Sequence, residues 1–234
     1  MKTVVLIPTY NEAENITSLL KEIINVIPEI NVLVIDDNSP DGTGKAVEEF
    51  SKNYSGVRLI SRSQKQGLGA AYVSGFKYAI GQNFDHIVTM DADFSHSPYV
   101  IPALINKMKD CDLILGSRYT EGGVNRWNIF RQFLSRSANI FIESKLNLHI
   151  KDYTTGFRCY KSRLLKNIDL DVVLSDGYAF QIEMAYKVYA VGGKVAEYPI
   201  TFTDRKRGRS KLSSLDIIEA FRTVLRLARS QKGL

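Results

Sequence analysis

The chain has 234 residues, of which 44% are hydrophobic and 24% charged, a composition ordinary for a soluble globular protein. This length allows one large α/β domain or two small ones. No apolar run approaches the roughly 20 residues of a membrane-spanning helix, and residues 1–30 show no signal-peptide pattern. Cys111 and Cys159 form no CxxC pattern, so the sequence favours a reducing compartment without structural disulfides.

The net charge of +6 is concentrated at one end of the chain. Residues 204–234 hold nine Lys or Arg and three acidic residues, whereas residues 1–203 hold 22 of each. Such asymmetry indicates an anionic partner near the C-terminus, which would be a phosphate group, a lipid surface or nucleic acid.

Apolar, β-branched strands alternate with helices through the first half of the chain. Strands are predicted over residues 3–7, 31–35, 57–60 and 112–116, with a further strand beginning at His86. Asn11 is expected to cap the first helix with Glu14 as its capping-box partner, and Ser97 and Pro98 to open a later one. This alternation predicts a Rossmann-like α/β fold with a mainly parallel sheet flanked by helices, in which ligands bind beyond the carboxyl ends of strands.

The second half of the chain is less regular. Helices are predicted over residues 126–146 and 177–191, and a polar loop over 151–158 leads into a short helix. A last strand is predicted over residues 194–202. The small residues of segment 66–71 favour close helix packing, because no Walker-type phosphate loop follows them.

A basic amphipathic helix is predicted over residues 212–234, attached to one compact domain over residues 1–211. Arg222, Arg226 and Arg229 form a single stripe on a helical wheel, beside a broad apolar arc. The helix would either pack its apolar arc on the domain or rest on an anionic membrane surface, and the sequence leaves both interpretations open.

Two carboxylates, Asp91 and Asp93, follow the strand that begins at His86. Alternate residues of a strand share a face, so both side chains are expected to point the same way. Two hard oxygen ligands suit a divalent cation that is shared with a phosphate. The alternative is that both acids merely form a turn. Segments 8–10 and 36–37 lie at the ends of other predicted strands, and this convergence favours a binding site.

Several segments, in order along the chain, resemble those of a known enzyme family. They are residues 7–12, 34–43, 90–93, 116–119, 155–158, 177–183, 202–205 and 210–211. Together they resemble the inverting nucleotide-sugar glycosyltransferases of GT-A fold, and more closely the dolichol-phosphate mannose synthases. The matches extend over nearly the whole chain, and the later segments are those that indicate a polyprenyl-phosphate acceptor.

The resemblance implies a donor site with a metal ion. The donor-binding residues would be Pro8, Tyr10, Glu12, Ile35, Asp37, Asp91, Ala92, Asp93, Arg118, Gln181, Arg205 and Lys211. Asp37 would accept a hydrogen bond from the nucleotide base. Asp91 would face the sugar nucleotide, and Asp93 would ligate Mg²⁺ or Mn²⁺ at the diphosphate, with Asp91 and Ser95 as further metal ligands. Ser95 stands where the family usually has glutamine, so metal preference is left open; His96 follows as in the family.

The resemblance also assigns roles to four cationic side chains. Arg118 and Arg131 would seat the acceptor phosphate and, with Asp91 and Asp93, make up the catalytic set. Arg205 and Lys211 would close over the diphosphate, with the loop over residues 204–211 acting as a lid. The alternative for all four is solvated surface charge.

The expected reaction is transfer of mannose from GDP-mannose to dolichyl (polyprenyl) phosphate, with inversion at the anomeric carbon. A UDP-sugar donor is the alternative, because base and sugar selectivity depend on pocket shape. The protein is expected to be cytoplasmic and peripheral on a membrane, with a membrane-anchoring subunit as one candidate partner. A nucleic-acid-binding module is disfavoured because residues 1–203 carry no net charge, and an inactive scaffold because both carboxylates are present.

Overall fold

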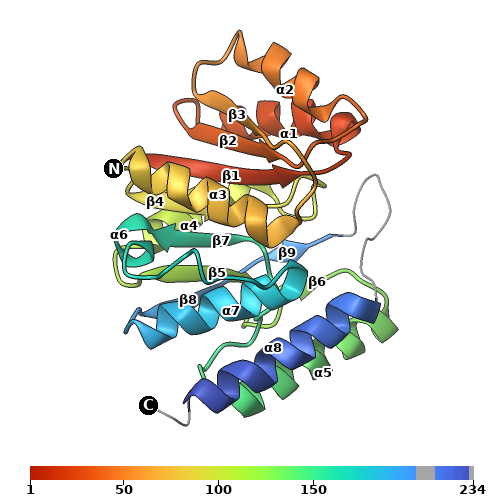
Figure 1. Ribbon diagram of the computed structural model, residues 1–234, viewed down its shortest axis with the longest axis vertical. Helices are drawn as coiled ribbons and strands as arrows, with labels where there is room; N and C mark the ends of the chain where they lie inside the picture. Colours follow the sequence, from red (N-terminus) through yellow and green to blue (C-terminus); the bar gives the residue numbers. More distant parts are fainter. Residues whose placement is uncertain (204–213, 232–234) are drawn as a thin grey trace.

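A seven-stranded sheet runs through the centre of the molecule in the strand order β3-β2-β1-β4-β7-β5-β8 (Figure 1). The computed structural model describes residues 1–203 and 214–231. The strands are β1 Thr3–Thr9, β2 Asn31–Asp36, β3 Val57–Ser61, β4 His86–Thr89, β5 Leu113–Ser117, β7 Arg158–Lys161 and β8 Val195–Pro199. Neighbouring strands are parallel except where β7 pairs antiparallel with β4 and β5. The predicted α/β fold with a mainly parallel sheet is confirmed.

A two-stranded sheet and the helices complete the fold. The small sheet pairs β6 Val124–Asn125 with β9 Thr201–Phe202. The helices are α1 Ala13–Val26, α2 Thr43–Ser51, α3 Leu68–Gly81, the 3₁₀ helix η1 Pro98–Val100, α4 Ile101–Lys107, α5 Ile129–Leu146, α6 Ser162–Leu165, α7 Gly177–Ala190 and α8 Ser214–Gln231.

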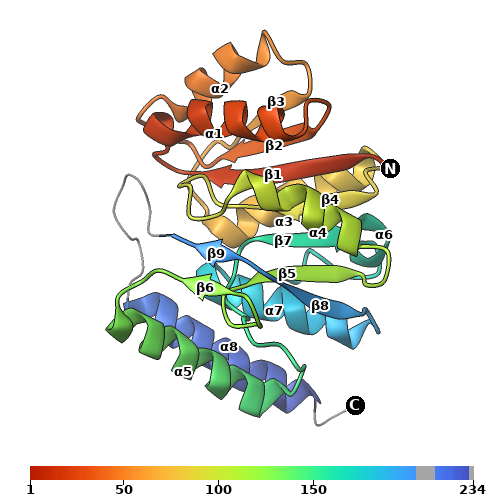
Figure 2. The same cartoon turned by 180° about the vertical axis from the view of Figure 1, so that it is seen from behind.

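Helices cover both faces of the sheet, as buried parallel strands require. Because successive strand residues point to opposite faces, β1 sends Val4 and Leu6 into one core and Val5 and Ile7 into the other. Figure 1 shows α3 and α7 on the first face, and Figure 2 shows α1 and α4 on the second. With both faces covered, polar ligands reach the sheet at its two ends.

The predicted N-cap at Asn11 is wrong. Helix α1 begins at Ala13 with Glu12 in the cap position, and Asn11 instead adopts a left-handed conformation with φ of 58°. Asparagine tolerates this region better than most residues, so it serves here as a turn residue after β1. Ser97 does precede η1, with Pro98 at its first position.

The second half of the chain departs most from its prediction. Strand β7 was not foreseen, because its four residues follow a loop and are too few to show a periodicity of their own. The single strand predicted over 194–202 is two strands, β8 and β9, in different sheets. The helix predicted from residue 126 begins at Ile129, where the Asn128 side chain accepts a hydrogen bond from the Arg131 N–H.

The C-terminal helix α8 packs beside α5 and α7 (Figures 1 and 2). Val224 and Leu227 are buried, and Phe221 stacks on Phe141 with ring centroids 5.2 Å apart. The Arg226 guanidinium donates to the buried Glu183 carboxylate at 3.1 Å, although the Arg226 side chain is 51% exposed and Arg222 and Arg229 are exposed as well. The predicted domain boundary at residue 211 lies outside the described residues. Among the described helices, none combines the length and apolarity that crossing a membrane requires.

Candidate active site

A cavity of about 390 Å³ opens at the carboxyl end of the parallel strands, and we call it the carboxyl-end cavity. Residues from the ends of β1, β2 and β4 meet there with the start of α3, the loop before β7 and the start of α7. Its lining residues are Pro8, Thr9, Tyr10, Glu12, Asp37, Lys65, Gly67, Leu68, Ala71, Asp91, Ala92, Asp93, Thr154, Gly156, Asp176, Gly177, Tyr178, Gln181 and Asp216.

The structure therefore brings most of the predicted donor residues together. Pro8, Tyr10, Glu12, Asp37, Asp91, Ala92, Asp93 and Gln181 all line the cavity. Ile35 does not line the cavity, because its side chain is fully buried in the core beneath α3, and its role as a donor contact stays a prediction. Ser95, Arg118 and Arg131 lie outside the lining, and Arg205 and Lys211 lie outside the described residues.

Asp91 and Asp93 lie in the loop after β4, and both line the carboxyl-end cavity. Their exposure differs: Asp93 is 3% exposed, whereas the Asp91 side chain is 37% exposed. The Asp93 Oδ1 accepts a hydrogen bond from the Ser95 N–H at 3.0 Å. The loop thus presents one fixed, buried carboxylate and one that is accessible from the cavity.

His96 supports Asp91 from behind. The Asp91 N–H donates to the His96 Nδ1 at 3.3 Å, and that nitrogen lies 3.7 Å from the Asp91 Oδ2. Burial lowers the pKa of His96, and the Asp91 charge only partly opposes this effect. An accepting Nδ1 and a lowered pKa both indicate a neutral ring protonated on Nε2, which stacks on Phe157 with centroids 5.0 Å apart.

The loop before β7 forms the wall opposite Asp91. A side-chain carbon added at Gly156 would lie 3.2 Å from the Asp91 Oδ1 and 3.6 Å from the Gln181 Nε2. Only glycine leaves this approach open. The Thr89 hydroxyl donates to the Gly156 carbonyl at 2.7 Å, which ties this wall to β4.

Arg158 anchors that wall from inside the protein. Its guanidinium is fully buried and donates to the carbonyls of Tyr153, Thr155 and Gln181 at 2.7–2.8 Å. Charged donors make strong hydrogen bonds, so this one side chain holds the loop and α7 together. The segment 155–158 was among those that resemble the family, but the sequence did not predict the hydrogen bond from Arg158 to the Gln181 carbonyl, because the two residues are 23 positions apart.

Asp37 shapes the opposite side of the cavity. The sequence predicted that its carboxylate accepts a hydrogen bond from a base. In the structure it accepts from the Arg62 guanidinium at 2.8 Å and from the N–H groups of Gln66 and Gly67 at 2.9 and 2.8 Å. Much of its accepting capacity is therefore used to hold the loop before α3.

That loop adds residues which the sequence did not identify. Lys65 lies over the Tyr10 ring, with its ammonium 3.9 Å from the ring centroid. The Gly69 N–H donates to the Asp176 carboxylate at 2.7 Å, and a side-chain carbon at Gly69 would lie 2.3 Å from the Ser175 carbonyl. The close packing predicted for residues 66–71 is confirmed, and the same segment also lines the cavity.

Arg118 and Arg131 flank an aromatic side chain beside the cavity. Arg118 is buried and donates to both carboxylate oxygens of Asp152 at 2.7 Å, while its guanidinium lies 5.0 Å from the Trp127 ring. Burial alone would raise the pKa of Asp152, but the Arg118 charge and hydrogen bonds hold it below its ordinary value. Arg131 is exposed, 6.0 Å from the same ring. Of the two, Arg131 is the one accessible to a ligand.

The acidic loop fits a hard divalent cation. No group of three or more His, Cys, Asp or Glu side chains placed to hold a metal occurs within residues 1–203 and 214–231, so other ligands would be oxygens of water, hydroxyl or diphosphate. The buried Ser95 hydroxyl has no hydrogen-bond partner among the described residues, although such groups are nearly always satisfied. Two carboxylates and an unsatisfied hydroxyl form the kind of donor set that Mg²⁺ or Mn²⁺ prefers.

The chain is similar to two enzymes over most of its length. It is 38% identical over 237 residues to an undecaprenyl-phosphate mannosyltransferase of Micrococcus luteus, covering 100% of this chain and 98% of that one. It is 41% identical over 222 residues to a polyprenol monophosphomannose synthase of Mycolicibacterium smegmatis, covering 94% and 84%.

A solved structure supports the fold. Glucosyl-3-phosphoglycerate synthase from Mycobacterium tuberculosis, in complex with Mn²⁺, UDP and glucosyl-3-phosphoglycerate, matches with a TM-score of 0.70 at 18% identity. The match covers 97% of this chain and 80% of that one, and it confirms the predicted GT-A fold. The family described as Glycosyl transferase family 2 matches residues 4–169. The chain belongs to glycosyl transferase family 2.

Proposed function

We propose that the protein transfers a mannosyl residue from GDP-mannose to a polyprenyl phosphate at the carboxyl-end cavity, with inversion. The observation that carries this proposal is the meeting of Asp91, Asp93, Gly156 and Gln181 in one cavity. The names of the two similar enzymes, both polyprenol-linked mannosyltransferases by description, supply the acceptor and the sugar.

The reaction asks for positioning more than for proton transfer. A phosphate monoester oxygen is already anionic at neutral pH, so it attacks the anomeric carbon without a strong general base. The new bond joins that carbon to the phosphate oxygen, while the bond to the nucleoside diphosphate breaks and the diphosphate leaves with the electron pair. A neutral His96 is consistent with this view, because it leaves the negative charge of Asp91 available to the sugar side of the donor.

A divalent cation would be held by Asp91 and Asp93, with Ser95 as a further oxygen donor. When bound, Mg²⁺ or Mn²⁺ supplies charge neutralisation for the departing diphosphate. The Mn²⁺ and UDP bound by the glucosyl-3-phosphoglycerate synthase support a metal–diphosphate site in this fold. Asp93 is buried and already fixed by the Ser95 N–H, so its side chain would lose the least conformational entropy when the cation binds.

The acceptor would approach from the side of α5 and α8. We define the apolar surface of these helices as Ile129, Phe130, Phe133, Ile217, Ile218 and Phe221, whose exposed fractions range from 46% to 86%. Exposed apolar side chains gathered in this way mark an interaction site, and a polyprenyl tail lies in a membrane. Arg131 lies on the same helix as Phe130 and Phe133, where it would meet the acceptor phosphate. The protein would therefore lie peripherally on a membrane, at the cytoplasmic face.

A donor panel tests the sugar nucleotide. We expect GDP-mannose with Mg²⁺ to raise the melting temperature and to label polyprenyl phosphate, with EDTA abolishing both effects. Transfer from UDP-glucose instead of GDP-mannose would show that the donor assignment is wrong while leaving the reaction class intact. The acceptor assignment fails if polyprenol without its phosphate is labelled equally well.

A liposome assay tests the membrane contact. Replacing both Phe130 and Phe133 by serine removes two exposed rings, and we expect co-sedimentation with anionic liposomes to weaken by about tenfold. Tyr99→Ser is the matched control, because Tyr99 is 67% exposed on η1, away from α5. Equal binding of the double variant and the control would exclude the apolar surface as the contact.

A further inference from the structure

A second cavity, of about 470 Å³, lies at the amino end of the parallel strands, and we call it the amino-end cavity. It is bounded by the start of β4, the end of β7 with the start of α6, the end of α4 and the turn after α3. Because β4 runs from His86 in this cavity towards Asp91 in the other, the two cavities lie at opposite ends of the sheet. Nothing in the proposed transfer reaction uses it.

Buried polar atoms in this cavity lack partners. His86 is 2% exposed and Ser162 is 3% exposed, yet both ring nitrogens of His86 and the Ser162 hydroxyl have no hydrogen-bond partner among the described residues. Three such atoms on two neighbouring residues of a cavity lining are unusual, because buried polar groups are nearly always paired. Their grouping indicates that a polar ligand supplies the missing partners.

The charges around these atoms are mostly positive. Lys109, Lys161, Arg163 and Lys166 all line the cavity, with Asp85 as the acidic residue of the lining. The Asp85 carboxylate already accepts the Lys2 N–H at 2.7 Å. Nearby Asp112 lies 3.3 Å from the Lys161 ammonium and 3.4 Å from the Arg163 guanidinium. For Lys109 and Lys166, no carboxylate lies within ion-pair distance in the described part of the chain.

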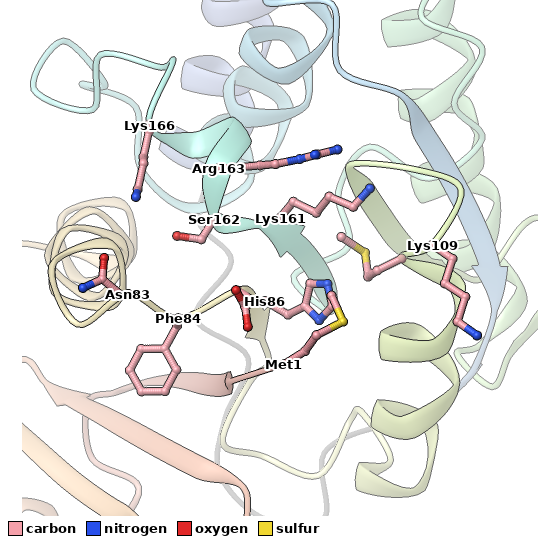
Figure 3. A pocket seen from close by; sticks show the side chains of 11 residues that line it. Met1, Asn83, Phe84, His86, Lys109, Lys161, Ser162, Arg163 and Lys166 are labelled. Carbon is pink, nitrogen blue, oxygen red and sulfur yellow. The ribbon is translucent and has the colours of Figure 1, made fainter.

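Figure 3 shows how these groups are arranged. Lys166, the Ser162 hydroxyl and Asn83 face one another on one side, and His86 lies with Lys161 and Lys109 on the other. These side chains come from segments that are distant in sequence, so no continuous sequence motif predicts the cavity. The Lys161, Arg163 and Lys109 side chains extend away from Lys166 and Ser162, so they add charge around the cavity. The converging ammonium and hydroxyl of Lys166 and Ser162, together with the imidazole that lacks partners among the described residues, suit a ligand that accepts several hydrogen bonds.

We propose that the amino-end cavity binds a small phosphate-bearing anion, either inorganic phosphate or a soluble phosphate monoester. A tetrahedral oxyanion offers acceptor atoms in several directions. It also supplies a negative counter-charge for Lys109 and Lys166, which have no carboxylate within ion-pair distance in the described part of the chain. Helix α5 begins just after β6, at the opposite end of the sheet from the amino-end cavity (Figure 1), and the apolar surface defined above includes its first two residues, Ile129 and Phe130. We therefore assign a soluble anion rather than a lipid headgroup as the ligand.

His86 gives the binding a pH dependence. Burial lowers the pKa of His86; Lys161 and the N-terminal amine act in the same direction, and Asp85 opposes them. Lys109, Arg163 and Lys166 add further positive charge around the cavity. A bound anion reverses this environment and favours the imidazolium, so binding takes up a proton and tightens as the pH falls.

Histidine side-chain NMR tests the proposal, because the chain has only three histidines. We expect inorganic phosphate, titrated against chloride at equal ionic strength, to shift the His86 ring signals and raise their pKa. His96, beside Asp91, reports separately on the carboxyl-end cavity, and His149, with its side chain 82% exposed, reports non-specific effects. This readout needs no transfer activity, so it stands or falls independently of the proposed function. A His86 shift no larger than that of His149 would overturn the proposal.

A variant and its control locate the ligand. Replacing Lys161 and Lys166 by methionine removes two of the cavity's charges, and we expect the phosphate affinity read at His86 to fall by about tenfold or more. Lys107→Met is the control, because Lys107 is an exposed lysine at the end of α4 outside the lining. An unchanged His96 signal verifies the fold. Equal affinities in the double variant and the control would refute the site, and a comparable response from glycerol 3-phosphate would extend it to phosphate monoesters. A response to anionic vesicles but not to either soluble anion would assign the cavity to a lipid headgroup and contradict the soluble ligand.

Discussion

The two ends of the parallel sheet treat charge in opposite ways. At the carboxyl end, the Asp93 carboxylate accepts a hydrogen bond from the backbone of its own loop, and the Asp37 carboxylate accepts hydrogen bonds from the Gln66 and Gly67 N–H groups of the loop before α3. At the amino end, Lys109 and Lys166 surround a cavity in which His86 and Ser162 lack partners among the described residues. Backbone N–H groups thus fix carboxylates at the first end before a ligand binds. Within the described part of the chain, each end also has an unpartnered buried hydroxyl, Ser95 and Ser162, and the second end adds an unpartnered imidazole among cationic side chains.

Loops that follow parallel strands carry free N–H groups which fix acidic side chains, as the Ser95 N–H fixes Asp93. The neighbouring strands β4 and β7 run between the two ends. Their residues His86 and Lys161 line the amino-end cavity, and the loops at their other ends contribute Asp91 and Gly156 to the carboxyl-end cavity.

The largest expected effect concerns the ion pair of Arg118 with Asp152 beside the carboxyl-end cavity, which is more deeply buried than the pair of Arg62 with Asp37. Asp152→Asn removes the counter-charge of Arg118, whose side chain is 3% exposed, and we expect a loss of about 3–5 kcal/mol in the free energy of unfolding. Urea denaturation measures it. If Arg118 instead seats the acceptor phosphate, as the sequence predicted, Asp152→Asn would leave stability nearly unchanged and alter the KM for polyprenyl phosphate.

The next effect concerns the wall opposite Asp91. Gly156→Ala places a carbon 3.2 Å from the Asp91 Oδ1, so that carboxylate must shift by a few tenths of an ångström. We expect kcat to fall by about tenfold, because displacements of about 1 Å at reacting groups cost roughly 100-fold. Gly81→Ala is the control, since nothing lies within 4 Å of its added carbon. Equal activity of both variants would show that Asp91 does not need this close approach.

A smaller effect involves both ends at once. Burial lowers the pKa of His86 and of His96 in the folded protein. Below the ordinary histidine pKa of about 6.5, the unfolded chain therefore binds more protons at these two residues than the folded chain does. We therefore expect the free energy of unfolding to fall as the pH drops from 7 through that value. Phosphate should reduce the fall, because it favours protonated His86 only in the folded state. Urea midpoints that are constant from pH 7.5 to 5.5 in these conditions, with or without phosphate, would contradict this account.

The smallest effect is at Ser162. Its buried hydroxyl makes no hydrogen bond with the described residues, so Ser162→Ala should change the free energy of unfolding by less than about 0.5 kcal/mol in chloride. In phosphate, the variant should lose part of the stabilisation that the wild-type protein gains. Thermal unfolding in the two salts separates these results, and a large loss in chloride alone would mean that the hydroxyl has a partner of its own.

The sequence predicted the carboxyl end far better than the amino end. Asp37, Asp91 and Asp93 directly follow apolar strands, and the carboxyl ends of parallel strands meet at one edge, so local pattern was enough to bring them together. It did not show that Asp37 is paired with Arg62, nor that Arg118 is paired with Asp152, since both contacts join segments 25 or more residues apart.

The amino end had no such signal. Lys109, Lys161 and Lys166 are ordinary surface lysines when taken singly, and Ser162 follows a strand, β7, that was itself not predicted. Only the antiparallel insertion of β7 between β4 and β5 places Ser162 beside His86. Insertion of a short strand depends on long-range pairing, which periodicity in a short segment cannot reveal.

The central claim is that the carboxyl-end cavity transfers mannose to a polyprenyl phosphate. Its most direct test is formation of lipid-linked mannose from GDP-mannose and undecaprenyl phosphate with Mg²⁺ or Mn²⁺, by the wild-type protein and by Asp93→Asn. We predict product from the wild-type protein and a rate lower by about 100-fold or more in the variant, with an unchanged melting temperature. Absence of lipid-linked mannose with either metal, or equal rates for the two proteins, would contradict the claim.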